Sequence, residues 1–107
     1  MLYNSPEWIT GGKYYSNCDV WSLGILMLEC ALGRNPLVKM NEDMKKITFI
    51  GLEERVHKRN LDVFPENLSE KFKDFVRQCL IKDPNKRPFS HKLLNHKFIE
   101  IHKKIKK

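Results

Sequence analysis

Residues 19–33 of this 107-residue chain read DVWSLGILMLECALG, and this stretch decides the fold. Its apolar side chains cover every side of a helix, which is typical of a helix buried within a protein. Ser16 and Asp19 have the spacing of a capping box at its start, and Gly33 marks its end. We therefore expect a central buried helix on which the other elements are mounted.

Shorter helical patterns lie on both sides of this stretch. Ser5 as N-cap and Pro6 at the first helical position favour one short turn over residues 6–9. Near the C-terminus, Ser69 is expected to cap a strongly periodic helix, and a short helix is expected over 90–95. The apolar stripe of the Ser69 helix consists of Phe72, Phe75, Val76, Cys79 and Leu80.

In the middle of the chain the helical periodicity of the apolar residues is weaker than in these segments. A short helix is expected over 41–50, capped by Asn41 and ended by Gly51. Its inward-facing residues would be Met44, Ile47 and Ile50. Residues 52–68 show no convincing period and are expected to form a long connection. Because no strand alternates cleanly, the fold class expected for the chain is all-α.

The net charge of +7 is concentrated at one end of the chain. Residues 92–107 carry six lysines and one glutamate, a net of +5, which leaves +2 for the first 91 residues. A lysine tail can contact nucleic acid or anionic lipid. Since no aromatic residue alternates with these lysines, a solvated end of chain is the favoured interpretation, and no nucleic-acid partner is expected.

The composition also limits the chemistry of the chain. The cysteines, Cys18, Cys30 and Cys79, are odd in number and scattered, which favours a reducing, cytoplasmic setting over a disulfide framework. The glycines form no phosphate-binding loop, and the histidines have no metal-site spacing. No stretch is long and apolar enough for a membrane span. We expect no catalytic, cofactor-binding or metal-binding residue in this chain.

Five motifs, taken together, resemble the C-terminal part of the C-lobe of eukaryotic protein kinases. They are Tyr3-Asn4-Ser5-Pro6-Glu7, Asp19-Val20-Trp21-Ser22-Leu23-Gly24, Ala31-Leu32-Gly33-Arg34-Asn35-Pro36, Cys79-Leu80-Ile81-Lys82-Asp83-Pro84-Asn85-Lys86-Arg87-Pro88 and Leu93-Leu94-Asn95-His96-Lys97-Phe98-Ile99. The resemblance implies a partial kinase domain over 1–99, from the end of the activation segment to the last helix, and a basic tail over 100–107. The fold implied is a helical fragment of the α+β kinase fold.

The resemblance also suggests a subgroup. Tyr3, two residues before Ser5, is similar to the pattern of Ser/Thr kinases. Residues 28–36 are most similar to the mitogen-activated protein kinase kinases, which places the chain among Ser/Thr or dual-specificity kinases.

The resemblance implies roles for individual residues. Glu7 would pair with Arg87, whereas the bare sequence allows Arg87 to be a surface base in a turn. Asp19 would accept backbone hydrogen bonds from the catalytic loop, besides its local capping role. Trp21 would be a structural residue of the central helix. The substrate-side residues would be Leu2, Tyr3 and Asn4, beside the substrate residue that follows the phosphoacceptor.

The motifs that carry phosphoryl transfer do not occur in this sequence. ATP and magnesium are therefore implied for the complete kinase and not for this fragment. The partners implied are the N-terminal part of the kinase domain, which would cover one face of the 19–33 helix, and a protein substrate or regulator at the 41–50 helix. The alternatives are a noncatalytic helical binding module or decoy, and a basic-tailed adaptor for anionic surfaces.

Overall fold

The computed structural model describes residues 2–12, 15–39 and 42–100. Within these ranges the chain is helical and has no strand, as the sequence predicts. The elements are α1 (Pro6–Gly11), α2 (Cys18–Leu32), the 3-10 helix η1 (Met44–Lys46), α3 (Phe49–Lys58), α4 (Glu70–Cys79) and α5 (Ser90–Leu93).

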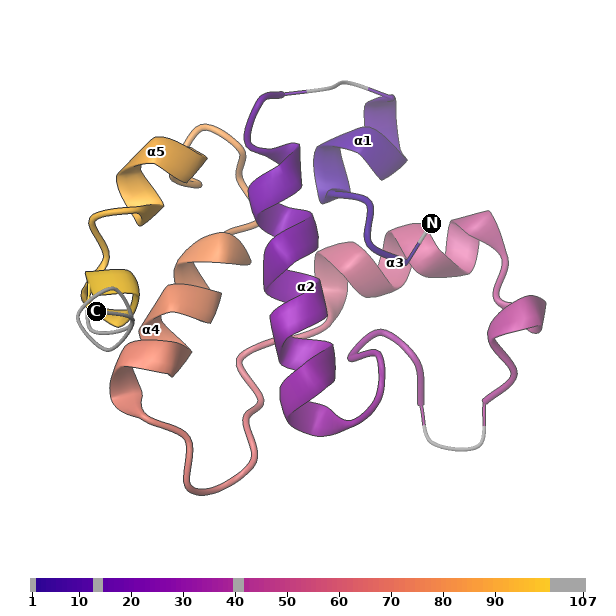
Figure 1. Cartoon of the computed structure of the whole chain (residues 1–107). Coiled ribbons are helices and arrows are strands. Elements are labelled where there is room, and N and C mark those ends of the chain that lie inside the picture. Colours follow the sequence, from indigo (N-terminus) through magenta and orange to yellow (C-terminus); the bar gives the residue numbers. More distant parts are fainter. Residues whose placement is uncertain (1, 13–14, 40–41, 101–107) are drawn as a thin grey trace.

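Helix α2 stands at the centre of the molecule, with α1 and α3 on one side and α4 and α5 on the other (Figure 1). Trp21, Ile25 and Leu28 of α2 have no exposed surface. The main apolar core forms around them from residues of every region between α1 and α4. Its other buried members are Ile9, Leu37, Leu52, Val56, Leu61, Val76 and Leu80.

The start of α2 differs from the predicted capping box. The N-cap is Asn17, one residue after Ser16, and its side chain does not cap the helix. The Asn17 amide nitrogen donates instead to the carbonyl oxygens of Pro84 and Arg87, at 2.6 and 2.9 Å. The capping-box prediction is therefore wrong, because a contact with a distant loop replaces the local one. The end at Gly33 is confirmed, with a left-handed φ of 78°.

One face of α2 is exposed within the described residues. The apolar pattern alone predicts burial on all sides, whereas the kinase resemblance leaves one face of this helix to the N-terminal part of the domain. Leu23 and Leu26 are 41% and 47% exposed, and Asp19 and Cys30 are exposed beside them. The spacing i, i+4, i+7, i+11 places these four residues on one side of the helix. We call this set the α2 stripe.

The middle of the chain folds differently from the predicted 41–50 helix. Only a 3-10 turn forms at Met44–Lys46, and α3 begins at Phe49. Gly51 lies inside the first turn of α3, and Ile50 is 77% exposed. Of the inward-facing residues predicted there, Met44 and Ile50 are exposed, and Ile47 packs against the core. The predicted cap, Asn41, lies outside the described residues.

The connection predicted over 52–68 is also wrong in its first half, because α3 continues to Lys58. Thr48 accepts a hydrogen bond from the amide of Gly51 and caps the helix. Leu52 and Val56, one turn apart, bury its inner face.

The predicted C-terminal helices are confirmed. Ser69 accepts a hydrogen bond from the amide of Phe72 and caps α4. Phe75, Val76 and Cys79 are buried along α4. Helix α5 follows the turn at Asp83-Pro84, and its Leu93 is buried against α4.

Candidate functional site

The structure brings together Glu7 in α1 and Arg87 in the loop before α5. The two guanidinium terminal nitrogens each donate to one carboxylate oxygen, both at 2.9 Å. The Arg87 side chain has no exposed surface and that of Glu7 is 8% exposed. Such a bidentate, buried pair fixes the orientation as well as the distance of its partners.

Arg87 also donates to three backbone carbonyls in two other parts of the chain. Its Nε donates to the carbonyl of Ile81 at 2.7 Å, and its terminal nitrogens donate to the carbonyls of Asn17 and Lys82 at 3.2 Å. The guanidinium lies 5.3 Å from the ring centroid of Trp21. The side chain therefore links α1, the start of α2 and the loop after α4.

The Glu7 carboxylate is held in its charged form. Burial alone raises the pKa of Glu7, but hydrogen bonds from Arg87, its own backbone amide and Cys18 outweigh this effect and lower the pKa to about 2. The Cys18 thiol donates to Glu7 Oε2 at 3.2 Å and accepts from the Ser5 hydroxyl at 3.1 Å. These contacts fix the turn between residues 5 and 7.

The predicted substrate-side residues lie along α2. The Tyr3 hydroxyl donates to Glu29 Oε2 at 2.6 Å, and the Ser22 hydroxyl donates to the Tyr3 carbonyl at 2.7 Å. The Glu29 hydrogen bond raises the pKa of the Tyr3 hydroxyl, with a smaller contribution from burial. Leu2 packs against the core, so the segment is fixed at its backbone and at both side chains.

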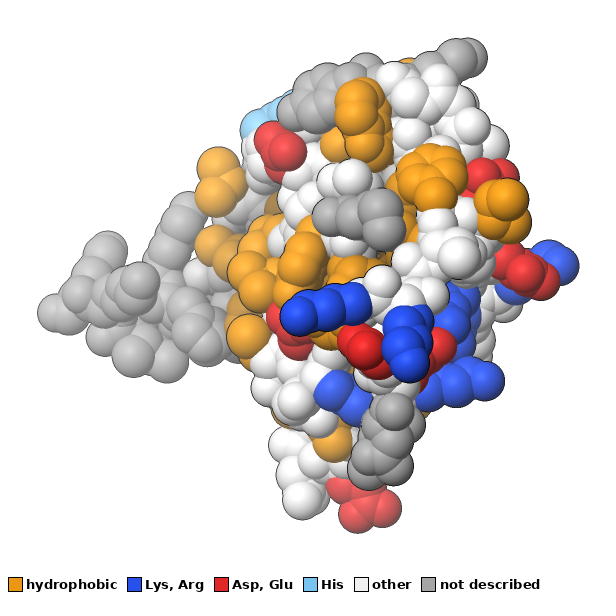
Figure 2. All heavy atoms as spheres, turned by 90° about the vertical axis from the view of Figure 1, so that its right-hand side faces the viewer, with side chains coloured by type: hydrophobic (Ala, Val, Ile, Leu, Met, Phe, Trp, Pro, Cys, Tyr) orange, Lys and Arg blue, Asp and Glu red, His pale blue; other side chains and the backbone are white. Residues whose placement is uncertain are grey.

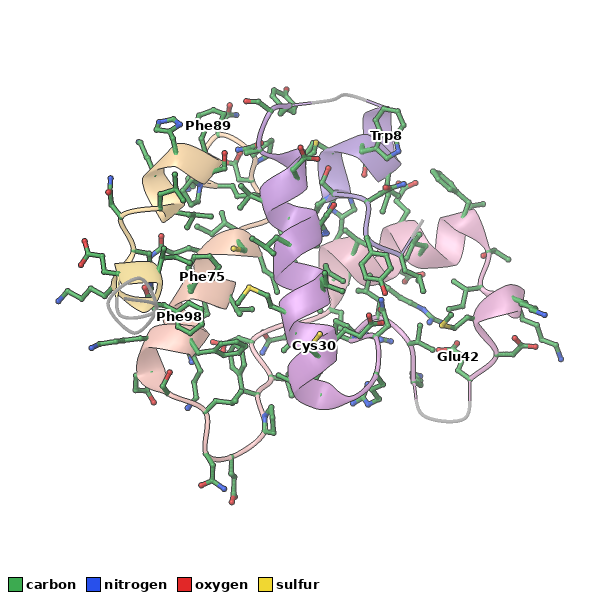
Figure 3. The ribbon with its side chains drawn as sticks, viewed as in Figure 1. Trp8, Cys30, Glu42, Phe75, Phe89 and Phe98 are labelled. Atoms are coloured by element: carbon green, nitrogen blue, oxygen red, sulfur yellow. The ribbon has the colours of Figure 1, made fainter. Side chains whose placement is uncertain are left out.

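A hollow of about 400 Å³ opens beside this segment. It is lined by Asn4, Ser5 and Trp8 of the N-terminal segment and by Cys18, Asp19 and Ser22 of α2. Trp8 projects from α1 (Figure 3) and is half exposed. Asn4, which is predicted to lie on the substrate side, and Asp19, which is predicted to be structural, therefore line the same hollow.

The sequence reasoning missed the side chains that hold this surface. Glu29 and Ser22 lie 26 and 19 residues after Tyr3, and Asn17 lies 70 residues before its partner Arg87. No local spacing marks such pairs. The signal available was the polar character of Ser22 and Glu29 within an otherwise apolar helix.

The region of the predicted 41–50 helix presents an exposed apolar surface. Met44, Phe49 and Ile50 are all more than half exposed, and Figure 2 shows this side of the molecule, with hydrophobic side chains beside basic and acidic ones. Beside this surface, Arg55 of α3 forms a bidentate ion pair with Glu42. Hydrogen bonds from Arg55 lower the pKa of Glu42 to about 2. We call Met44, Phe49 and Ile50 the α3 apolar surface.

The described residues lack two features by which metals and nucleotides are commonly bound. No group of three His, Cys, Asp or Glu side chains comes together among them. None of the glycines lies in a phosphate-cradling sequence. In the part of the chain that the structure describes, no helix has the length and apolar character to cross a membrane.

Comparison with known proteins identifies the family of the chain. The protein kinase domain family matches residues 1–99. The chain is 37% identical to mitogen-activated protein kinase kinase 2 of Arabidopsis thaliana over 91% of its own length and 27% of the relative's. It is 40% identical to the serine/threonine-protein kinase dst1 of Dictyostelium discoideum, over 94% of the chain and 13% of dst1.

A human protein gives a similar match. Mitogen-activated protein kinase kinase kinase 19 is 36% identical over 90% of the chain and 7% of its own length. The chain thus spans about a quarter or less of the length of these relatives. Because the family matches nearly the whole chain, this protein belongs to the protein kinase domain family and is a fragment of such a domain.

Proposed function

We propose that this chain is the substrate-side part of a kinase C-lobe in a signalling cascade. The complete enzyme would transfer the γ-phosphate of ATP to Ser or Thr, and in a dual-specificity enzyme also to Tyr, of a protein substrate. The observation that supports this best is the fixed segment at residues 2–7, held by the pairs Glu7–Arg87 and Tyr3–Glu29. A rigid segment positions a substrate without losing further entropy on binding.

The residues present do not fit ATP or magnesium. No carboxylate cluster among the described residues could hold a divalent cation, and no glycine-rich loop could cradle phosphates. The nucleotide chemistry would belong to other parts of the complete kinase, so we propose that this chain alone transfers no phosphate. Its own residues would orient the protein substrate beside Leu2, Tyr3 and Asn4.

Two surfaces fit the partners expected of such a fragment. The α2 stripe exposes two leucines between Asp19 and Cys30, and this stripe would meet the N-terminal part of the kinase domain. The α3 apolar surface would bind a protein substrate or regulator through exposed Phe49 and Ile50. The unpaired state of the three cysteines fits a reducing, cytoplasmic setting.

The second candidate function is a noncatalytic binding module or decoy. The exposed α3 apolar surface favours it, because that surface does not depend on nucleotide chemistry. The two candidates predict different results for the complete protein.

A phosphate-transfer assay separates them. The complete protein is incubated with γ-labelled ATP, magnesium and myelin basic protein, and the 107-residue chain is assayed in parallel. We expect label on Ser or Thr with the complete protein and none with the chain alone. Transfer by the chain alone would contradict the assignment of the chemistry to other parts. Absence of transfer by the complete protein would favour the noncatalytic module.

A further inference from the structure

A second hollow lies on the side of α2 opposite the α2 stripe. It has a volume of about 400 Å³ and lies between the end of α2, the loop at 34–39 and the chain leaving α3. Its apolar lining includes Leu28, Leu32 and Val63, and its cationic lining is Arg34, Lys39 and Arg59. We call it the basic hollow. It shares no lining residue with the α2 stripe or the α3 apolar surface.

The charged residues that line the basic hollow all have the same sign. None of the described residues that line it is acidic. Arg34 and Arg59 each donate through one nitrogen to a neutral backbone carbonyl, of Val38 at 3.1 Å and of Pro36 at 3.2 Å. These bonds hold the guanidinium groups in place without neutralising their charge, and a guanidinium retains further donors for a carboxylate.

The carboxylate on the Lys39 side is already engaged. Glu42 accepts from the backbone amide of Lys39 at 2.9 Å, but both of its oxygens pair with Arg55. The positive field of the hollow therefore remains available to a ligand with negative charge.

The chain beside the hollow also has an unused backbone donor. Residues 60–65 form no helix or turn, and the amide of Val63, which lines the hollow, donates to no described residue. Val63 is 52% exposed at the edge of the hollow. An unpaired amide next to an apolar side chain is a feature by which an extended peptide is bound along its main chain.

We propose that the basic hollow binds an extended acidic segment of a partner protein. Carboxylates of that segment would pair with Arg34, Lys39 and Arg59. Its apolar side chains would enter between Leu32 and Val63, and one of its carbonyls would accept from the amide of Val63. An acidic occupant is favoured by charge complementarity, since the described lining residues include three cations and no anion. The site goes beyond the proposed phosphate transfer and does not depend on it.

The probe is a capped, fluorescent ten-residue peptide of alternating Glu and Val, measured by anisotropy against the complete protein without ATP. A Lys–Val peptide of the same length is the charge control. Binding of the Glu–Val peptide that weakens with salt is expected. Equal binding of the two peptides, or no binding of either at 1 mM, would overturn the proposal.

Lys39→Glu is the decisive variant, because this side chain is exposed and its reversal places a negative charge in the hollow. We expect peptide affinity to fall about tenfold. Lys45→Glu, at a lysine of η1 that is also exposed, makes the same change of charge; it is the matched control and should bind as the parent does. If Lys39→Glu lowers the thermal stability, Lys39→Gln takes its place, and we expect a smaller loss of peptide affinity from it.

Hydrogen exchange locates the bound peptide. Slower exchange of the Val63 amide in the presence of the peptide is expected. Protection confined to the α3 apolar surface would overturn the proposal. Phosphatidylserine vesicles form a second arm, and vesicle binding that depends on Lys39 without any peptide binding would show that the hollow recognises a lipid headgroup instead.

Discussion

Arg87 holds Glu7 by two hydrogen bonds of 2.9 Å between residues 80 positions apart in the chain. The same guanidinium bonds to the carbonyls of Asn17, Ile81 and Lys82. A single buried side chain therefore connects the first helix to the loop that precedes the last one. The stability of residues 1–10 should depend on this connection more than on local helix propensity, since α1 has only six residues.

Arg87→Ala tests this dependence. Removing one partner of a buried pair leaves the other charge uncompensated, and we expect the free energy of unfolding to fall by about 3–5 kcal/mol. Limited proteolysis should cut within residues 1–10 much faster in this variant than in the parent protein. Lys86→Ala, at the exposed neighbouring base, is the control and should resemble the parent. Equal proteolytic sensitivity of the two variants would count against the structural role of Arg87.

The same pair predicts a pH dependence of stability. The pKa of Glu7 is lowered from 4.5 to about 2, so its stabilisation is complete above about pH 4.5 and is lost as the pH falls toward 2. The linkage between pKa and folding gives about 3 kcal/mol for this shift. Glu7→Gln cannot ionise, so the difference in unfolding free energy between parent and variant should shrink between pH 5 and pH 2.

Urea denaturation at several pH values measures that difference. Glu66→Gln, at an exposed carboxylate, is the control, and its curve should run parallel to that of the parent. A Glu7→Gln curve that also runs parallel to the parent would mean that the carboxylate gains nothing from Arg87.

Parts of this fold could be predicted because their causes are local. Ser69 precedes an apolar stripe with helical period, and the hydroxyl caps α4 as expected. Gly33 ends α2 in a left-handed conformation that glycine adopts without strain. The Glu7–Arg87 pair was expected only through the kinase resemblance, since no spacing relates positions so far apart.

Other parts depend on contacts between distant segments. Asn17 replaces Ser16 at the start of α2 because its amide binds carbonyls 67 and 70 residues away. The pattern does not predict α3 because a glycine such as Gly51 is typical of a helix end, whereas its amide donates to the Thr48 hydroxyl inside the first turn. The spacing of Leu52 and Val56, one helical turn apart, was the signal that could have shown it.

Tyr3→Phe tests the substrate-side role. It removes one hydroxyl, whose hydrogen bond to Glu29 should contribute about 1 kcal/mol to stability. In the complete kinase we expect the KM for a protein substrate to rise and the KM for ATP to remain unchanged. Tyr15→Phe is the matched control, because this tyrosine is exposed to a similar extent. A rise in both KM values would show a general loss of structure and not a local role.

Gly24→Ala tests the packing of α2 against α4. A β-carbon at position 24 would lie 2.6 Å from Cβ of Cys79 and 2.8 Å from Cδ2 of Leu80, closer than carbon atoms approach. Alanine favours a helix by about 1 kcal/mol, but overpacking costs about 1–3 kcal/mol, so a net loss of thermal stability is expected. Gly51→Ala, where the new carbon meets only the Thr48 hydroxyl, should lose less. A more stable Gly24→Ala variant would show that the two helices can separate at no cost.

The α2 stripe gives different predictions for the isolated chain and the complete kinase. Leu23 and Leu26 are nearly half exposed here, so the 107-residue chain should bind a hydrophobic dye, and replacing both by Ser should weaken that binding without lowering its stability. In the complete kinase the same replacements should cost stability, because the stripe would be buried against the N-terminal part of the domain. Met44→Ser with Ile50→Ser, at the α3 apolar surface, controls for the loss of two exposed apolar side chains. A chain that unfolds cooperatively as a monomer without binding dye would contradict the assignment of the stripe to a missing partner.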